Sequence, residues 1–139
     1  MDSFRTTIPV QRAPFSINHT DGLMLAGSCF TEHIGNRLAE AKFSPRVNPF
    51  GIVYNPLSIA RCLERLWAAD RPFRAAELFE NAGLWRSWEH HSAFAGTTPE
   101  GALHRINEAY SADAAALRQT SRLLLTFGTA DVFVLRSTG

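Results

Sequence analysis

Two short runs of continuous apolar residues predict strands. One run covers residues 23–26 and ends at Gly27-Ser28, and the other covers residues 123–127 and ends at Gly128-Thr129. Apolar runs of this length that stop at a turn are typical of strands buried on both faces of a parallel sheet. The sequence therefore predicts a central strand in the first run and a second buried strand in the other, each followed directly by a glycine turn.

Apolar residues at helical spacing predict three helices. The first follows Ser28, and its stripe is Phe30, Ile34, Leu38 and Ala41. The others begin at Asn55-Pro56 and Thr98-Pro99, where a capping residue precedes a proline that suits the first helical position. We expect them to span residues 57–69 and 99–119, with buried stripes Ile59, Cys62, Leu63, Leu66 and Trp67 in one and Leu103, Ile106, Tyr110, Ala114 and Leu117 in the other.

The remaining segments carry weaker patterns. Residues 1–22 are predicted to form an arm with one short extended piece, and residues 47–54 a loop with a short apolar stretch. A short helix is predicted over residues 75–80, a long loop with some strand over residues 84–94, and an edge strand or strand continuation over residues 132–135.

The alternation of apolar strands with helices favours one α/β domain over residues 23–139, with a mainly parallel sheet flanked by helices. Ligands of such sheets bind at the carboxyl ends of the strands. Both glycine turns lie at these ends, so the sequence predicts a site there.

Composition narrows the function classes. The chain has 14 Lys plus Arg and 13 Asp plus Glu, a net charge of +1, which offers no strong field for nucleic acid or an anionic membrane. It has no run of about 18 apolar residues to span a bilayer, and its N-terminus lacks the apolar core of a secretory signal. We therefore expect a cytoplasmic protein with reduced cysteines and no cofactor. We also expect no metal, because the histidines match no zinc-binding spacing.

Ser28 is the first candidate for chemistry. A serine between a buried strand and a helix has its hydroxyl at the sheet edge among free backbone N–H groups, which suits a nucleophile with an oxyanion site. The same position suits a serine that only caps the helix. The neighbouring Cys29 is either a reactive thiolate at a helix N-terminus, an oxyanion donor through its N–H, or a small buried residue.

Four sequence blocks resemble the GSCFA family, which is named for a Gly-Ser-Cys-Phe-Ala motif and is placed with the SGNH (GDSL-like) hydrolases. The blocks are residues 27–30, followed by Thr31 in place of the motif's alanine, residues 48–56, residues 85–94 and residues 126–130. They occur in the family's order, and together they extend over most of the chain.

The resemblance implies a flavodoxin-like, SGNH-hydrolase-like sheet in which Ser28 attacks an ester or acyl carbonyl. It also implies oxyanion donors at the Ser28 backbone N–H, at Gly51 and at Gly128-Thr129. Typical SGNH enzymes have an asparagine where this chain has Thr129, so a threonine hydroxyl takes that role here.

Cys29, Asn55 and His91 complete the expected oxyanion and substrate-binding set. His91 matches the family's His-Ser position, but a histidine in an aromatic loop serves packing as readily as chemistry. Gly51 has a second interpretation too, as a turn residue that needs a positive φ.

The histidine base of SGNH enzymes belongs to a fourth block, and no residue of this chain matches it. We therefore expect a hydrolase or acyltransferase domain, truncated at its C-terminal end, that acts on a small-molecule or acylated substrate through Ser28 and is inactive or weak without a base. The alternatives are a non-catalytic binding module and an incomplete gene product. A truncated sheet has an unpaired edge, which predicts self-association.

Overall fold

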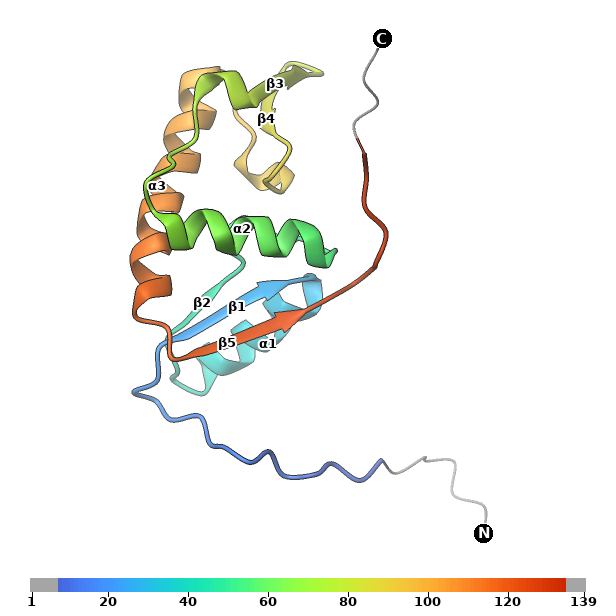
Figure 1. The fold of residues 1–139 in the computed structure, drawn as a ribbon, viewed down its shortest axis with the longest axis vertical. Coiled ribbons are helices and arrows are strands. Elements are labelled where there is room, and N and C mark those ends of the chain that lie inside the picture. The colour runs from blue at the N-terminus through green and yellow to red at the C-terminus, as the bar shows by residue number, and fades with distance from the viewer. Residues whose placement is uncertain (1–7, 135–139) are drawn as a thin grey trace.

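A parallel sheet lies in the lower part of Figure 1, in a computed structural model that describes residues 8–134. β1 (Leu23–Gly27) lies between β2 (Pro45–Val47) and β5 (Arg122–Thr126), in the order β2-β1-β5. All of β1 is buried, and it pairs in parallel with β5 up to Gly27 and Thr126. The predicted α/β class with a parallel sheet is confirmed.

The two outer strands differ from the sequence prediction. The sequence pattern does not predict β2, because its three residues are too few to show a strand pattern and the first of them is a proline. A proline is nevertheless tolerated as the first residue of an edge strand. β5 is the other edge, and Leu123 and Leu125 are 43% and 39% exposed. The expectation that this run is buried on both faces is therefore wrong. Residues 132–134 form no strand, and Leu135 lies outside the described residues.

Helices α1 (Cys29–Glu40) and α2 (Pro56–Ala68) cover opposite faces of the sheet (Figure 1). The inward face of α1 begins at the buried Thr31, not at Phe30, which is 58% exposed. On α2 the predicted cap is confirmed, because Asn55 Oδ1 accepts the Ser58 N–H at 2.8 Å. Trp67 is exposed, against the prediction, because it lines an open groove beside the uncovered edge strand.

Helix α3 (Pro99–Arg118) confirms the second cap, since Thr98 Oγ1 accepts the Gly101 N–H at 3.1 Å. It packs on α2 around one core, which consists of Phe50, Cys62, Leu66, Phe73, Ile106, Tyr110 and Ala114. Cys62 belongs to this core, as predicted, and its burial raises the pKa of the thiol to about 12. No helix within residues 8–134 has the length and apolar character needed to cross a membrane.

A β-hairpin replaces the short helix predicted over residues 75–80. One 3-10 turn, η1 (Ala75–Glu77), leads into β3 (Leu78–Asn81), which pairs antiparallel with β4 (Leu84–Ser87). Ala82 and Gly83 both have positive φ, as a two-residue hairpin turn requires. Alanine is not typical of such a turn, so the residues at this position do not predict the hairpin. A second 3-10 turn, η2 (Ser92–Phe94), follows.

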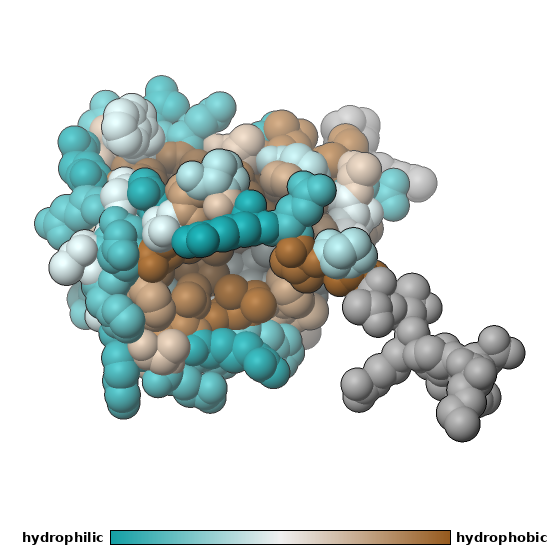
Figure 2. Space-filling model, turned by 90° about the horizontal axis from the view of Figure 1, so that it is seen from below, coloured by the Kyte–Doolittle hydropathy of each residue, from teal (hydrophilic) through white to brown (hydrophobic). Residues whose placement is uncertain are grey.

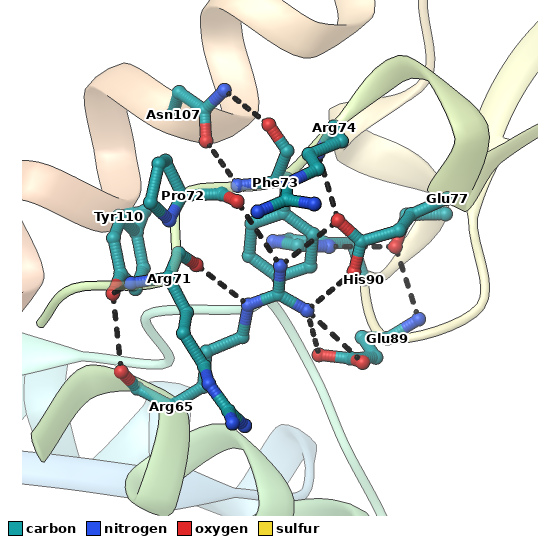
Figure 3. A network of polar contacts seen from close by, with 11 residues as sticks. Arg65, Arg71, Pro72, Phe73, Arg74, Glu77, Glu89, His90, Asn107 and Tyr110 are labelled. Atoms are coloured by element: carbon teal, nitrogen blue, oxygen red, sulfur yellow. Dashed lines mark hydrogen bonds and ion pairs between the residues drawn. The ribbon is translucent and has the colours of Figure 1, made fainter. Parts of the chain in front are cut away.

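Arg65 ties the segment 71–94 to α2 (Figure 3). Its guanidinium lies 3.4 Å from the centre of the Phe73 ring and donates to Glu77, to Glu89 and to the carbonyl oxygens of residues 71 and 72. The hydrogen bond from Arg65 holds the pKa of Glu77 below its ordinary value. This network holds the loop that carries His91 in its place.

Candidate active site

Ser28 lies at the carboxyl end of the central strand, as the residue that joins β1 to α1. Its backbone is extended, and its side chain makes no capping hydrogen bond to α1. Ser28 Oγ lies instead 3.0 Å from Thr126 Oγ1, at the end of β5. The hydroxyl is therefore not used as a helix cap, and it stands where the parallel strands end.

Gly27 allows the two strand ends to approach this closely. Its φ is +146°, and a Cβ at this position would lie 2.0 Å from the Thr126 carbonyl oxygen. Thr126 Oγ1 accepts the Ser28 backbone N–H at 3.1 Å and is also hydrogen-bonded to Thr31 Oγ1 on α1. Three hydroxyls thus meet between β1, α1 and β5.

The second block closes over the end of β1 from the β2 side. Asn48 Oδ1 accepts the Gly27 N–H at 2.9 Å, and Val53 N–H donates to the Gly27 carbonyl oxygen, also at 2.9 Å. Asn48 is buried with a φ of +47°, in the left-handed region that asparagine tolerates better than most residues. Its Nδ2 has no hydrogen-bond partner among residues 8–134.

Gly51 and His91 lie against each other, and this contact joins the second block to the third. A Cβ on Gly51 would lie 2.4 Å from His91 Cβ, and His91 N–H donates to the Phe50 carbonyl oxygen at 2.9 Å. His91 Nδ1 accepts the Ala93 N–H at 3.3 Å, so this ring atom caps η2. The neighbouring His90 is stacked on Phe50, and burial lowers its pKa to about 3.

The last block is anchored to the second block by its backbone. The N–H groups of Gly128 and Thr129 donate to the Tyr54 carbonyl oxygen at 2.8 and 3.2 Å. Thr129 Oγ1 donates to Asp131 Oδ2 at 3.3 Å. The contact of this block with Ser28 is made by Thr126.

The predicted oxyanion donors differ in what their N–H groups already bind. The N–H of Ser28 donates to Thr126, and the N–H of Gly51 donates to the Asn48 carbonyl oxygen at 2.8 Å. Cys29 is the first residue of α1, and no acceptor for its N–H lies within the described chain. The N-terminal end of a helix favours negative charge, so an anion beside Ser28 would be stabilised there. The Cys29 thiol is exposed, not buried.

Thr31, Asn48 and Thr126 had no assigned role in the sequence interpretation. Thr126 is the one polar residue within the apolar run 123–127, which is a usable signal for it. Thr31 and Asn48 become recognisable only when the strand order is known. The described residues contain no group of three or more His, Cys, Asp or Glu side chains that could hold a metal ion.

Together these contacts define an α/β domain with a serine at the carboxyl end of its central parallel strand. The GSCFA family model matches residues 22–139, so the chain belongs to the GSCFA family. Searches of curated proteins and of solved structures give no match.

Proposed function

We propose that this chain is an SGNH-type hydrolase or acyltransferase domain with a flavodoxin-like sheet that acts through Ser28. The observation that carries the proposal is the placement of Ser28, whose Oγ lies at the end of the central strand and bonds to Thr126 instead of capping α1. The neighbouring Cys29 N–H supports it, because a helix N-terminus offers a donor to a developing oxyanion.

In the proposed reaction Ser28 Oγ forms a bond to the carbonyl carbon of an ester while its proton passes to a base. The tetrahedral intermediate places its negative oxygen at the N-terminus of α1. Its collapse breaks the bond to the leaving alcohol, which takes the proton from the base. The acyl group on Ser28 then passes to water in a hydrolase, or to another hydroxyl or amine in a transferase.

A base must be supplied for this reaction to be fast, because an unactivated serine hydroxyl is a poor nucleophile near neutral pH. In the described part of the chain the N–H and the hydroxyl of Ser28 bond to Thr126, and no histidine takes part in these bonds. We therefore expect Ser28 to react slowly in this chain alone and faster with an external base such as imidazole.

The test is labelling by a fluorophosphonate probe at increasing imidazole concentration, followed by peptide mapping. We expect labelling at Ser28 that rises with imidazole and is lost in Ser28→Ala. Ser44→Ala, which removes an exposed serine hydroxyl, is the matched control and should be labelled like the wild type. Equal labelling of the wild type and Ser28→Ala would refute the proposal.

A binding module without chemistry is the second candidate function. It is favoured by the hydrogen bonds of the Ser28 hydroxyl, which within the described residues involve Thr126 and no histidine, while His91 Nδ1 accepts the Ala93 N–H and His90 is buried. It predicts a folded chain in which imidazole produces no labelling of Ser28, so the same experiment separates the two functions.

A further inference from the structure

The three hydroxyls at the site restrict where their protons can lie. A threonine hydroxyl offers one proton and two lone pairs. On Thr126, one lone pair is taken by the Ser28 backbone N–H at 3.1 Å. One proton and one lone pair remain for the hydroxyls of Ser28, at 3.0 Å, and Thr31. Two proton arrangements of the cluster are therefore possible.

In the first arrangement Ser28 donates to Thr126, and Thr126 donates to Thr31. Thr31 is 0% exposed, and within residues 8–134 Thr126 is the partner of its hydroxyl. The Thr31 proton then has no acceptor, and a buried donor without a partner loses the free energy of its hydrogen bonds to water.

In the second arrangement Thr31 donates to Thr126, and Thr126 donates to Ser28. Both threonine protons now have acceptors. Each arrangement leaves one hydroxyl oxygen without a donor, that of Ser28 in the first and that of Thr31 in the second, so the two differ in which proton has no acceptor. The unpaired proton is now that of Ser28, which is 8% exposed whereas Thr31 is 0% exposed, so this arrangement leaves the free proton on the hydroxyl that has access to solvent.

We propose that Thr31 and Thr126 form a directed hydrogen-bond chain that ends on Ser28 Oγ. Through this chain Thr126 stabilises the negative charge that develops on Ser28 Oγ as the proton leaves, and the Ser28 proton stays available to a base. Thr31 is a positioning residue that acts through Thr126. The effect on reaction rate rests on the proposed function, whereas the direction of the chain rests on the contacts alone.

Fluorophosphonate labelling rates at fixed imidazole test the effect on Ser28. We expect Thr126→Val to lower the rate at least about tenfold, because it removes a hydrogen bond to a developing charge. Thr31→Val should lower the rate by a smaller factor and move its pH profile to higher pH, and Thr31→Ser should restore both. Thr120→Val removes a threonine hydroxyl that bonds to the Ala116 carbonyl oxygen, and it should label like the wild type. Unchanged rates in both Thr31→Val and Thr126→Val would overturn the role in the reaction.

Neutron diffraction from crystals of the deuterated chain tests the direction independently of labelling. We expect the Thr126 deuteron on the line to Ser28 Oγ and the Thr31 deuteron on the line to Thr126. A Thr126 deuteron that points to Thr31 would overturn the chain, whatever the labelling rates. If the deuterons lie as expected while Ser28 is not labelled even with imidazole, the proposed function fails and the hydrogen-bond chain stands.

Discussion

The Arg65 network and the Ser28 hydroxyl cluster differ in how completely their hydrogen bonds are used. The guanidinium of Arg65 makes contacts through all three of its nitrogen atoms, to two carboxylates and two carbonyl oxygens. Around Ser28, the Asn48 Nδ2 and the Cys29 N–H have no partner within the described residues. Because buried polar groups are normally paired, the fully paired Arg65 network indicates a structural role, whereas the unpaired amide nitrogen of the buried Asn48 supports the proposed ligand site at the end of β1.

The largest expected effect comes from Gly27→Ala, which acts on the hydroxyl cluster. The new Cβ would lie 2.0 Å from the Thr126 carbonyl oxygen, and the backbone has a φ of +146°. We expect the free energy of unfolding to fall by about 4 kcal/mol, because both the contact and the backbone are strained. Urea denaturation measures it. Gly83→Ala is the control, since it also has a positive φ but nothing within 4 Å of the new Cβ, and it should cost about 1 kcal/mol.

Arg65→Ala should act on stability and not on Ser28. It removes the contact with Phe73 and leaves Glu77 and Glu89 without their ion pair. We expect a loss of about 3 kcal/mol in the free energy of unfolding, with the labelling rate of the folded fraction unchanged. Arg61→Ala, on an exposed position of the same helix, should cost less than about 0.5 kcal/mol. A stable Arg65→Ala chain with an altered rate at Ser28 would reverse the roles assigned to the two clusters.

His90 should make stability depend on pH. Burial lowers its pKa in the folded chain to about 3 from an ordinary value of 6.5. The unfolded chain therefore binds a proton that the folded chain does not, and stability falls as the pH falls from 6.5 towards 3. We expect a loss of roughly 2 to 3 kcal/mol between pH 7 and pH 4.5.

His90→Phe isolates this contribution. Glu77 acts in the same direction, because its lowered pKa makes stability fall on acidification, but it is present in both proteins. The free energy of unfolding should therefore fall less on acidification in His90→Phe than in the wild type, by the amount that His90 supplies. His104→Gln, on an exposed part of α3, should behave like the wild type. Urea denaturation at each pH measures this change. An equal fall in the free energy of unfolding in the wild type and in His90→Phe would contradict the conclusion that His90 is buried in its neutral form.

Leu125→Lys is expected to have the smallest effect on stability but a measurable effect on the self-association of the chain. Leu123 and Leu125 are exposed on the edge strand β5, and Figure 2 shows apolar side chains gathered around a hollow on one face of the molecule. We expect the wild type to self-associate in sedimentation and Leu125→Lys to reduce this association with little change in unfolding. Ala112→Lys adds the same charge on exposed α3 and should not reduce it. A monomeric wild type would contradict the predicted self-association.

The sequence predicted best the elements that carry local signals. Asn55-Pro56 and Thr98-Pro99 mark the starts of α2 and α3 correctly, because a cap and its proline act within one turn of helix. The exposure of Trp67 and of β5 could not be predicted, because periodicity shows which residues share a face but not whether another element covers it. β2 and β3 are too short to carry a pattern.

The candidate site could be predicted in part for the same reason. Ser28 follows from its place between an apolar run and a helix, which is a local pattern. Thr126 lies 98 residues away along the chain and reaches Ser28 only because β5 pairs with β1. The strand order decides that contact, and no local pattern contains it.

In the proposed reaction Ser28, and not the neighbouring exposed Cys29, carries the acyl group. This role of Ser28 is tested most directly by incubating the chain with a p-nitrophenyl ester and imidazole and locating the acyl group by peptide mass spectrometry, with Cys29→Ala and Ser28→Ala as controls. The acyl group should be found on Ser28 in the wild type and in Cys29→Ala, and should be absent from this segment in Ser28→Ala. An acyl group on Cys29, or none on either residue while the chain is folded, would contradict the role of Ser28 as the nucleophile.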